Sequence, residues 1–144
     1  MNVLFLFGPN LGALGRRDPD TYGTQTLAQI VEELDRRALE LGHTIRWHQS
    51  DHEGDLVGWL LAAPDDGVDA VVLNGGALSH YSYALRDAIE ACGLPTIEVH
   101  MSHIHGREAF RRRSVTAEVC RASITGLGAG GYHLALEAMP WITS

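Results

Sequence analysis

The segment NVLFLFGPN at residues 2–10 decides the fold, because it begins with a short apolar run and ends in a glycine–proline pair. A run of this length bounded by turn residues is typical of a strand that is buried on both faces. Such strands occur in parallel sheets whose two faces are covered by helices. We therefore expect a buried strand over Asn2–Phe7, with Gly8–Asn10 leaving its carboxyl end.

Further short apolar runs alternate with longer amphipathic segments along the chain. The predicted strands are Thr44–His48, Ala70–Leu73, Thr96–His100 and Ala122–Thr125, and the predicted helices are Thr26–Leu41, Glu53–Ala63, Tyr81–Cys92 and Gly130–Met139. Strands that alternate with helices indicate βαβ units and a parallel sheet. Five strands in 144 residues predict an α/β, flavodoxin-like, doubly wound five-stranded parallel sheet in a single domain. In the helix Glu53–Ala63 we expect Leu56, Val57, Leu60 and Leu61 to face inward.

Composition excludes several classes of function. The formal net charge of −7 argues against a nucleic-acid-binding protein, which needs a basic surface. All eleven basic residues are arginine, so neither a lysine Schiff base nor a GxxxxGK[ST] phosphate loop can form. The chain shows no membrane-spanning apolar run and no secretory signal, and Cys92 and Cys120 lack the spacing of a disulfide framework. These features predict a cytoplasmic protein.

Topology predicts where a ligand would bind. In doubly wound sheets the site lies beyond the carboxyl ends of the strands, near the point where the strand order reverses. The segments that leave the first four strands are Gly8–Asn10, Gln49–Glu53, Asn74–His80 and His100–Ser102. All four are polar or glycine-rich, which predicts a convergent polar site.

The stretch EVHMSHIHGREAFRRRS at residues 98–114 allows a metal site, an anion-binding face or an acid–base pair. Glu98 and His100 share one face of a strand, whereas His103 and His105 lie in the following loop. No HExxH or CxxC pattern supports a zinc site. A carboxylate that orients an imidazole is typical of acid–base catalysis, and a purely structural pair is the alternative. Of the three consecutive arginines at 111–113, we expect only one to face a site.

The segment GRRDPDTYG at residues 15–23 has a glycine at each end, which favours a mobile loop. It contains two arginines and a tyrosine. A cation beside a tyrosine favours the phenolate, which can act as a general base. An ordinary exposed loop is the alternative.

Two other motifs have structural explanations. The formal GxGxxG at residues 126–131 does not open the first βα unit, as a dinucleotide site requires, so we expect a tight strand-to-helix turn. Ser79 and Ser82 lack a GxSxG elbow and are expected to cap a helix or form hydrogen bonds.

Taken together, five segments resemble the type II 3-dehydroquinate dehydratases. They are GPNLGALGRRDPDTYG at 8–23, QSDHEGDLVGWL at 49–60, NGGALSHYSYALRDA at 74–88, IEVHMSHIHGREAFRRRS at 97–114 and GLGAGGYHLAL at 126–136. The resemblance implies a cofactor-free, metal-free lyase that converts 3-dehydroquinate to 3-dehydroshikimate. It also implies a homododecamer built as a tetramer of trimers.

The resemblance implies catalytic roles for five residues. Tyr22 would be the base that removes the proton at C2. Arg17, rather than Arg16, would hold and activate Tyr22. Asn10 would help to stabilise the enolate. His100 would protonate the departing C1 hydroxyl, with Glu98 fixing its tautomer.

The substrate-binding residues that the resemblance implies are Asn74, His80, Asp87, Met101, Ser102 and Arg111. Asn74 would hold the leaving group, and Ser102 with neighbouring backbone N–H groups would bind the carboxylate. His80 and Arg111 would contact ring hydroxyls. Asp87 would act at a subunit boundary, and Glu53 would support the site.

Four positions depart from the family pattern: Phe7, Gly12, Gly75 and His103. None removes a named catalytic group, but Phe7 and His103 put the support of Asn10 and Ser102 in question. The alternatives are a flavodoxin-like protein that binds a cyclic polyol acid without turnover, a lyase acting on a related hydroxy-keto ring acid, and a metal-dependent hydrolase. The sequence leaves open whether the reaction serves aromatic biosynthesis or quinate catabolism.

Overall fold

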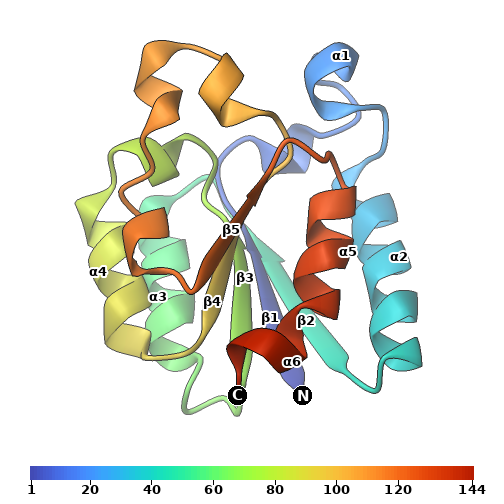
Figure 1. Cartoon of the computed structure of the whole chain (residues 1–144), viewed down its shortest axis with the longest axis vertical. Coiled ribbons are helices and arrows are strands. Elements are labelled where there is room, and N and C mark those ends of the chain that lie inside the picture. The colour runs from blue at the N-terminus through green and yellow to red at the C-terminus, as the bar shows by residue number, and fades with distance from the viewer.

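A five-stranded parallel sheet forms the centre of the molecule (Figure 1). The structure is a computed structural model that describes residues 1–144. The strands are β1 (Asn2–Phe7), β2 (Thr44–Gln49), β3 (Ala70–Asn74), β4 (Thr96–His100) and β5 (Ala122–Thr125). Their order in the sheet is β2-β1-β3-β4-β5, and every neighbouring pair is parallel. The predicted α/β, doubly wound sheet is confirmed.

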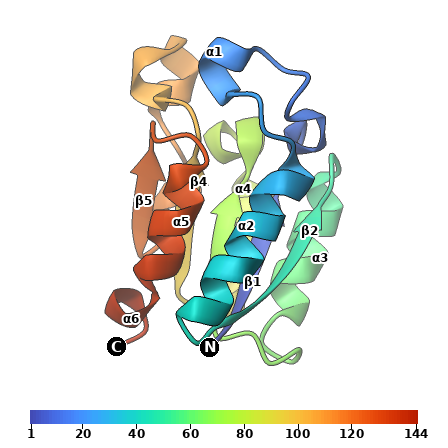
Figure 2. The same ribbon diagram turned by 90° about the vertical axis from the view of Figure 1, so that its right-hand side faces the viewer.

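Helices cover both faces of this sheet, as Figure 2 shows from the side. The longer helices are α2 (Leu27–Glu40), α3 (Glu53–Ala62), α4 (Tyr83–Cys92) and α5 (Gly130–Glu137), and the short ones are α1 (Pro19–Tyr22) and α6 (Met139–Ile142). Five 3₁₀ turns complete the chain: η1 (Leu11–Ala13), η2 (Gly76–His80), η3 (Ile104–Gly106), η4 (Ala109–Arg112) and η5 (Ala117–Val119). Helices α2 and α5 share one core with the sheet, and α3 and α4 share the other.

Local sequence signals set several helix boundaries. Thr26 and Gln29 form a reciprocal capping box at the start of α2. Ser82 caps α4 by accepting a hydrogen bond from the Leu85 N–H, so the helix begins at Tyr83, two residues later than predicted. Gly93, in the left-handed conformation, ends the same helix.

The inward positions of α3 are only partly as predicted. Leu56 and Leu60 are fully buried, but Leu61 is 52% exposed and Val57 is half-buried. Helix α3 carries more apolar positions than one face can bury, so periodicity alone could not choose among them. The predicted helix Gly130–Met139 also differs, because α5 ends at Glu137 and a separate turn, α6, follows.

The sheet order creates a switch point between β1 and β3, because the chain leaves β1 toward β2 and later continues on the other side. The loops that leave β1 and β3 approach closely there, and the Gly8 N–H donates to the Asn74 carbonyl at 2.8 Å. A Cβ on Gly8 would lie 2.7 Å from the Gly75 carbonyl oxygen, so only glycine fits. None of the helices combines the length and the apolar character needed to cross a membrane.

Candidate active site

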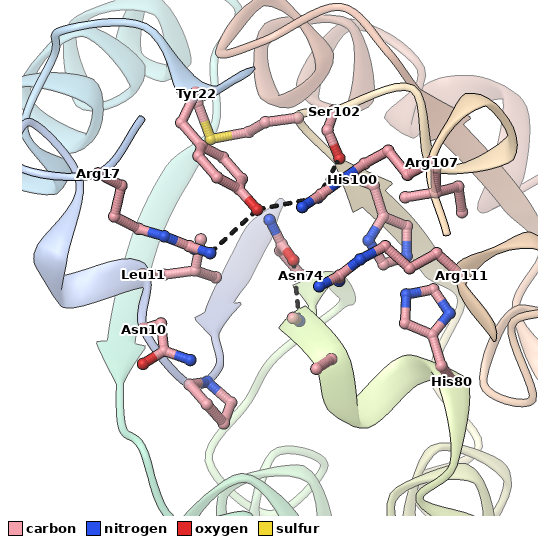
Figure 3. Close-up of a pocket in the computed structure, with 15 residues that line it drawn as sticks. Asn10, Leu11, Arg17, Tyr22, Asn74, His80, His100, Ser102, Arg107 and Arg111 are labelled. Carbon is pink, nitrogen blue, oxygen red and sulfur yellow. Dashed lines mark hydrogen bonds between the residues drawn. The ribbon is translucent and has the colours of Figure 1, made fainter. Parts of the chain in front are cut away.

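A cleft opens beyond the carboxyl ends of β1, β3 and β4 (Figure 3). It is lined by Pro9, Asn10, Leu11, Arg17, Tyr22, Asn74, Gly76, Ala77, His80, His100, Met101, Ser102, Ile104, Arg107 and Arg111. Three of the four predicted segments contribute to this lining. The segment Gln49–Glu53 does not, because it packs behind the first loop: Gln49 donates to the Gly8 carbonyl, and Asp51 accepts from the Asn10 N–H at 2.8 Å.

The phenol of Tyr22 lies between two arginines at one side of the cleft. Arg17 donates to the Tyr22 oxygen at 3.0 Å, and its guanidinium also lies 3.9 Å from the centre of the ring. Arg107 donates to the same oxygen at 2.9 Å (Figure 3). Two guanidinium groups therefore donate to this one oxygen.

Arg107 also donates to the Ser102 hydroxyl at 3.0 Å, so it connects Tyr22 to the loop after β4. The sequence analysis missed Arg107, because it lies 85 positions from Tyr22 and no spacing rule joins the two. Its place five residues after Ser102, in the same polar loop, was the available signal.

Glu98 and His100 lie on one face of β4, as the strand period predicts. Glu98 is fully buried and His100 nearly so, and the Nε2 of His100 lies 3.0 Å from the Glu98 carboxylate. The hydroxyls of Ser114 and Thr116 also donate to this carboxylate. Burial raises the pKa of Glu98, but the hydrogen bond and charge of His100 and the two hydroxyls outweigh burial, so the pKa lies below its ordinary value.

His80 lies beside this pair, with its ring 5.7 Å from the ring of His100. Its Nδ1 donates to the Arg113 carbonyl at 2.7 Å. Burial is the main cause that lowers the pKa of His80 below its ordinary value, with the nearby charges of His100 and Arg111 acting in the same direction. A neutral His80 therefore faces the cleft at neutral pH.

Asn74 lies at the centre of the cleft in Figure 3 and is held on both sides of its amide. Its Nδ2 donates to the Tyr132 hydroxyl at 2.7 Å, and its Oδ1 accepts from the Gly76 N–H at 3.0 Å. Tyr132 is fully buried on α5, and burial raises its pKa well above the ordinary value. The sequence analysis gave Tyr132 no role.

The remaining predicted residues divide into two groups. Asn10, Met101, Ser102 and Arg111 line the cleft, and Asn10 adopts the left-handed conformation with φ of 70°. Arg111 is the only one of its run of three arginines that does so. Asp87 lies outside the cleft on α4, where its side chain is 74% exposed and contacts Arg86 at 3.5 Å.

The predicted loop 15–23 contains one helical turn, α1, which the sequence analysis did not predict. Asp18 caps this turn, and Pro19 occupies its first position. Gly15 and Gly23 both have positive φ, at 90° and 74°, so the segment is joined to the body through two glycine positions. The glycines at 126–131 form the expected turn between β5 and α5, and Gly131 packs against Val99.

Three of the four departures from the family pattern, Phe7, Gly12 and Gly75, fall into two kinds of place. Phe7 is fully buried and packs edge-on against Tyr132, with ring centres 5.3 Å apart. Gly12 and Gly75 lie where a Cβ would meet Gln49 and Ser79 at less than 3 Å. No group of three His, Cys, Asp or Glu side chains in the chain is arranged so that it could hold a metal ion.

Comparison with known proteins identifies the family. The family model described as "Dehydroquinase class II" matches residues 1–140. A 3-dehydroquinate dehydratase of Leptothrix cholodnii is 51% identical over 138 residues, which cover 96% of this chain and 93% of the relative. The crystal structure of a type II dehydroquinase from Butyrivibrio crossotus, 37% identical, superposes with a TM-score of 0.94 over 97% of each chain. One from Propionibacterium acnes, 43% identical, gives 0.92 over 96% of this chain and 94% of its own. By its sequence and by its structure, the chain belongs to the class II dehydroquinases.

Proposed function

We propose that this enzyme dehydrates 3-dehydroquinate to 3-dehydroshikimate by general acid–base chemistry, without a cofactor. The family match and relatives named 3-dehydroquinate dehydratase at about half identity support the reaction. One observation carries the mechanism: a tyrosine oxygen held by two arginines shares a cleft with a histidine held by a buried carboxylate.

Tyr22 acts as the base in this proposal. A proton next to a ketone needs a strong base, and a phenolate flanked by Arg17 and Arg107 supplies one. The phenolate takes the C2 proton, and the C–H electrons form the enolate. Asn10 lies in the same cleft and helps to place the donors that stabilise the enolate oxygen.

His100 acts as the acid in the second step. The enolate re-forms the ketone, the new double bond forms between C1 and C2, and the C1–O bond breaks. Because Nε2 of His100 contacts Glu98, and Nδ1 makes no hydrogen bond within the chain, Nδ1 gives its proton to the departing hydroxide, which leaves as water. The Asn74 amide, fixed by Tyr132, holds the leaving oxygen.

The other cleft residues bind the substrate. Ser102 and the backbone N–H groups next to Met101 bind the carboxylate, since Arg107 brings positive charge to the Ser102 hydroxyl. Arg111 uses Nε for Glu108, so its terminal nitrogens are available to the ring hydroxyls, as is the free nitrogen of His80.

We extend the proposal to the lid and the assembly. The segment 15–23 opens to admit the substrate and closes to bring Tyr22 in, with its two positive-φ glycines as hinges. The chains assemble as a dodecamer, a tetramer of trimers, in which the exposed Asp87 lies at a subunit boundary. Light scattering measures the mass that decides this point.

The reaction is tested by following the ultraviolet absorbance of the conjugated enone product when purified enzyme meets 3-dehydroquinate with a chelator present. We expect turnover by the wild type and by Tyr83→Phe, whose hydroxyl is exposed outside the cleft. Tyr22→Phe should lose about 10²- to 10⁴-fold in kcat, the usual worth of a general base. A folded wild type that gives no enone would refute the dehydratase, and an active Tyr22→Phe would refute the base.

A further inference from the structure

The carboxylate of Glu98 is buried with every oxygen occupied. One oxygen, Oε2, accepts from His100 at 3.0 Å and from the Ser114 hydroxyl at 2.7 Å. The other, Oε1, accepts from the Thr116 hydroxyl. Glu98 itself has no exposed surface, so no solvent helps to stabilise its charge. Its ionisation depends on these three donors.

We propose that Thr116 and Ser114 are positioning residues for catalysis, which keep Glu98 ionised and so keep His100 an imidazolium, whose Nδ1 proton is the one transferred. The inference rests on the proposed roles of His100 as acid and Glu98 as its partner. Neither hydroxyl contacts the cleft, so both act through Glu98.

The physical reason lies in how a buried pair shares one proton. The proton can reside on the imidazole, leaving a carboxylate, or on the carboxyl, leaving a neutral imidazole. Only in the first arrangement is His100 an imidazolium, whose Nδ1 proton is acidic enough to pass to the leaving group. Hydrogen bonds donated to a carboxylate stabilise its ionised form, so the two hydroxyls favour the arrangement that catalysis needs.

The other titratable groups around the pair do not replace these hydroxyls. His80 stacks on His100, and Arg111 lies near enough to affect His80, but neither donates to Glu98. Cys120, on the far side, has its pKa raised by burial and then by the charge of Glu98, so it remains a neutral thiol.

The segment that carries the hydroxyls is fixed in place. The buried Val115 donates its N–H to the Ser79 carbonyl at 2.8 Å. The Ala117 N–H donates to the Ser114 hydroxyl at 3.1 Å, which orients its oxygen. The carbonyl of Arg113 holds His80. One short segment therefore positions both histidines of the cleft.

The test replaces Thr116 by valine, which keeps the shape and removes the hydroxyl. We expect kcat on its pH plateau to fall by up to about tenfold, the low end for a hydrogen bond to a charged group. The hydroxyl also stabilises the state in which both groups have lost their protons. Its loss should therefore move the alkaline decline of kcat to higher pH, by up to about one unit.

The matched control is Thr96→Val. Thr96 is buried on β4, the strand that carries Glu98, but its hydroxyl donates only to the Leu94 carbonyl. We therefore expect no fall in kcat and no shift of the alkaline decline in this variant. Thr116→Ser should restore both quantities. Ser114→Ala should reproduce the pattern if Thr116→Val does not fold.

Histidine NMR gives a second readout that does not require turnover. The His100 signal, assigned by its absence in His100→Asn, should titrate at higher pH in Thr116→Val and show less imidazolium on the plateau. If the wild type turns over and Thr116→Val has the same pH dependence of kcat and the same His100 titration, this inference is overturned. The proposed function then still stands. If the wild type is inactive but the His100 titration still moves to higher pH in Thr116→Val, only the proposed function is rejected.

Discussion

The two sides of the cleft are built in different ways. The base side is assembled from half-buried loop residues: Tyr22 comes from a segment between two positive-φ glycines and meets Arg107 from a loop 85 positions away. The side of the proposed acid lies on β4, between β3 and β5, where Glu98 and His100 are buried and the carboxylate has three donors. In the proposed mechanism, the acid would therefore be set before the substrate binds, and closure of the loop would complete the base.

The largest effect should come from the acid itself. His100→Asn removes the only transferable proton on this side, so we expect kcat to fall about 10²- to 10⁴-fold, as for loss of a general acid. The thermal midpoint should also drop, because the buried Glu98 loses its partner. Tyr22→Phe should lose similar activity with little change in midpoint, since Tyr22 is half-buried. Equal midpoint shifts in the two variants would contradict the comparison.

A smaller effect should follow from removing the contact between Tyr22 and the loop after β4. Arg107→Gln removes a charged donor from both Tyr22 and Ser102, and we expect a loss of about 10- to 100-fold in kcat/KM. Arg112→Gln is the control, because Arg112 lies outside the cleft and is exposed. Steady-state kinetics on both variants measures the difference. Equal rates for the two would show that Arg107 does not support the base.

The smallest effect concerns stability against pH. The pKa of Glu98 is lowered in the folded chain from an ordinary value of 4.5, so the unfolded chain binds the proton more readily. This group stabilises the fold fully above pH 4.5, and the contribution is lost as pH falls through the lowered pKa. Glu98→Gln cannot titrate, so its free energy of unfolding should fall less between pH 6 and pH 3.5. Urea unfolding at both pH values checks this, and parallel losses in the two proteins would reject it.

The strands were predictable because their runs are short, apolar and bounded by turns. Thr96–His100 and Ala122–Thr125 have the predicted bounds. Exposure on helices was harder to predict: Leu61 is apolar but lies on the outer side of α3. Its burial depends on which face meets the sheet, and a helix with more apolar positions than one face can bury does not encode that choice.

The site was predictable where one strand or one loop carries it. Glu98 and His100 are two positions apart, so the strand period alone puts them together. Arg107 and Tyr132 were missed, because each reaches its partner only through the tertiary fold. Resemblance to a family named the groups expected to touch substrate and two of their supports, Arg17 and Glu98, but not the supports Arg107 and Tyr132.

Because of Tyr132, the residues that line the cleft differ in how easily they can be substituted. Its hydroxyl holds Asn74, and its ring packs on the fully buried Phe7, so one cleft amide is connected to the hydrophobic core. Arg111 stands on the 3₁₀ turn η4 and carries no such connection. Selection for a new ring acid could therefore change position 111 without repacking the core, while position 74 could change only together with the core. The enzyme's evolvable surface is the mouth of the cleft, and its floor is inherited with the fold.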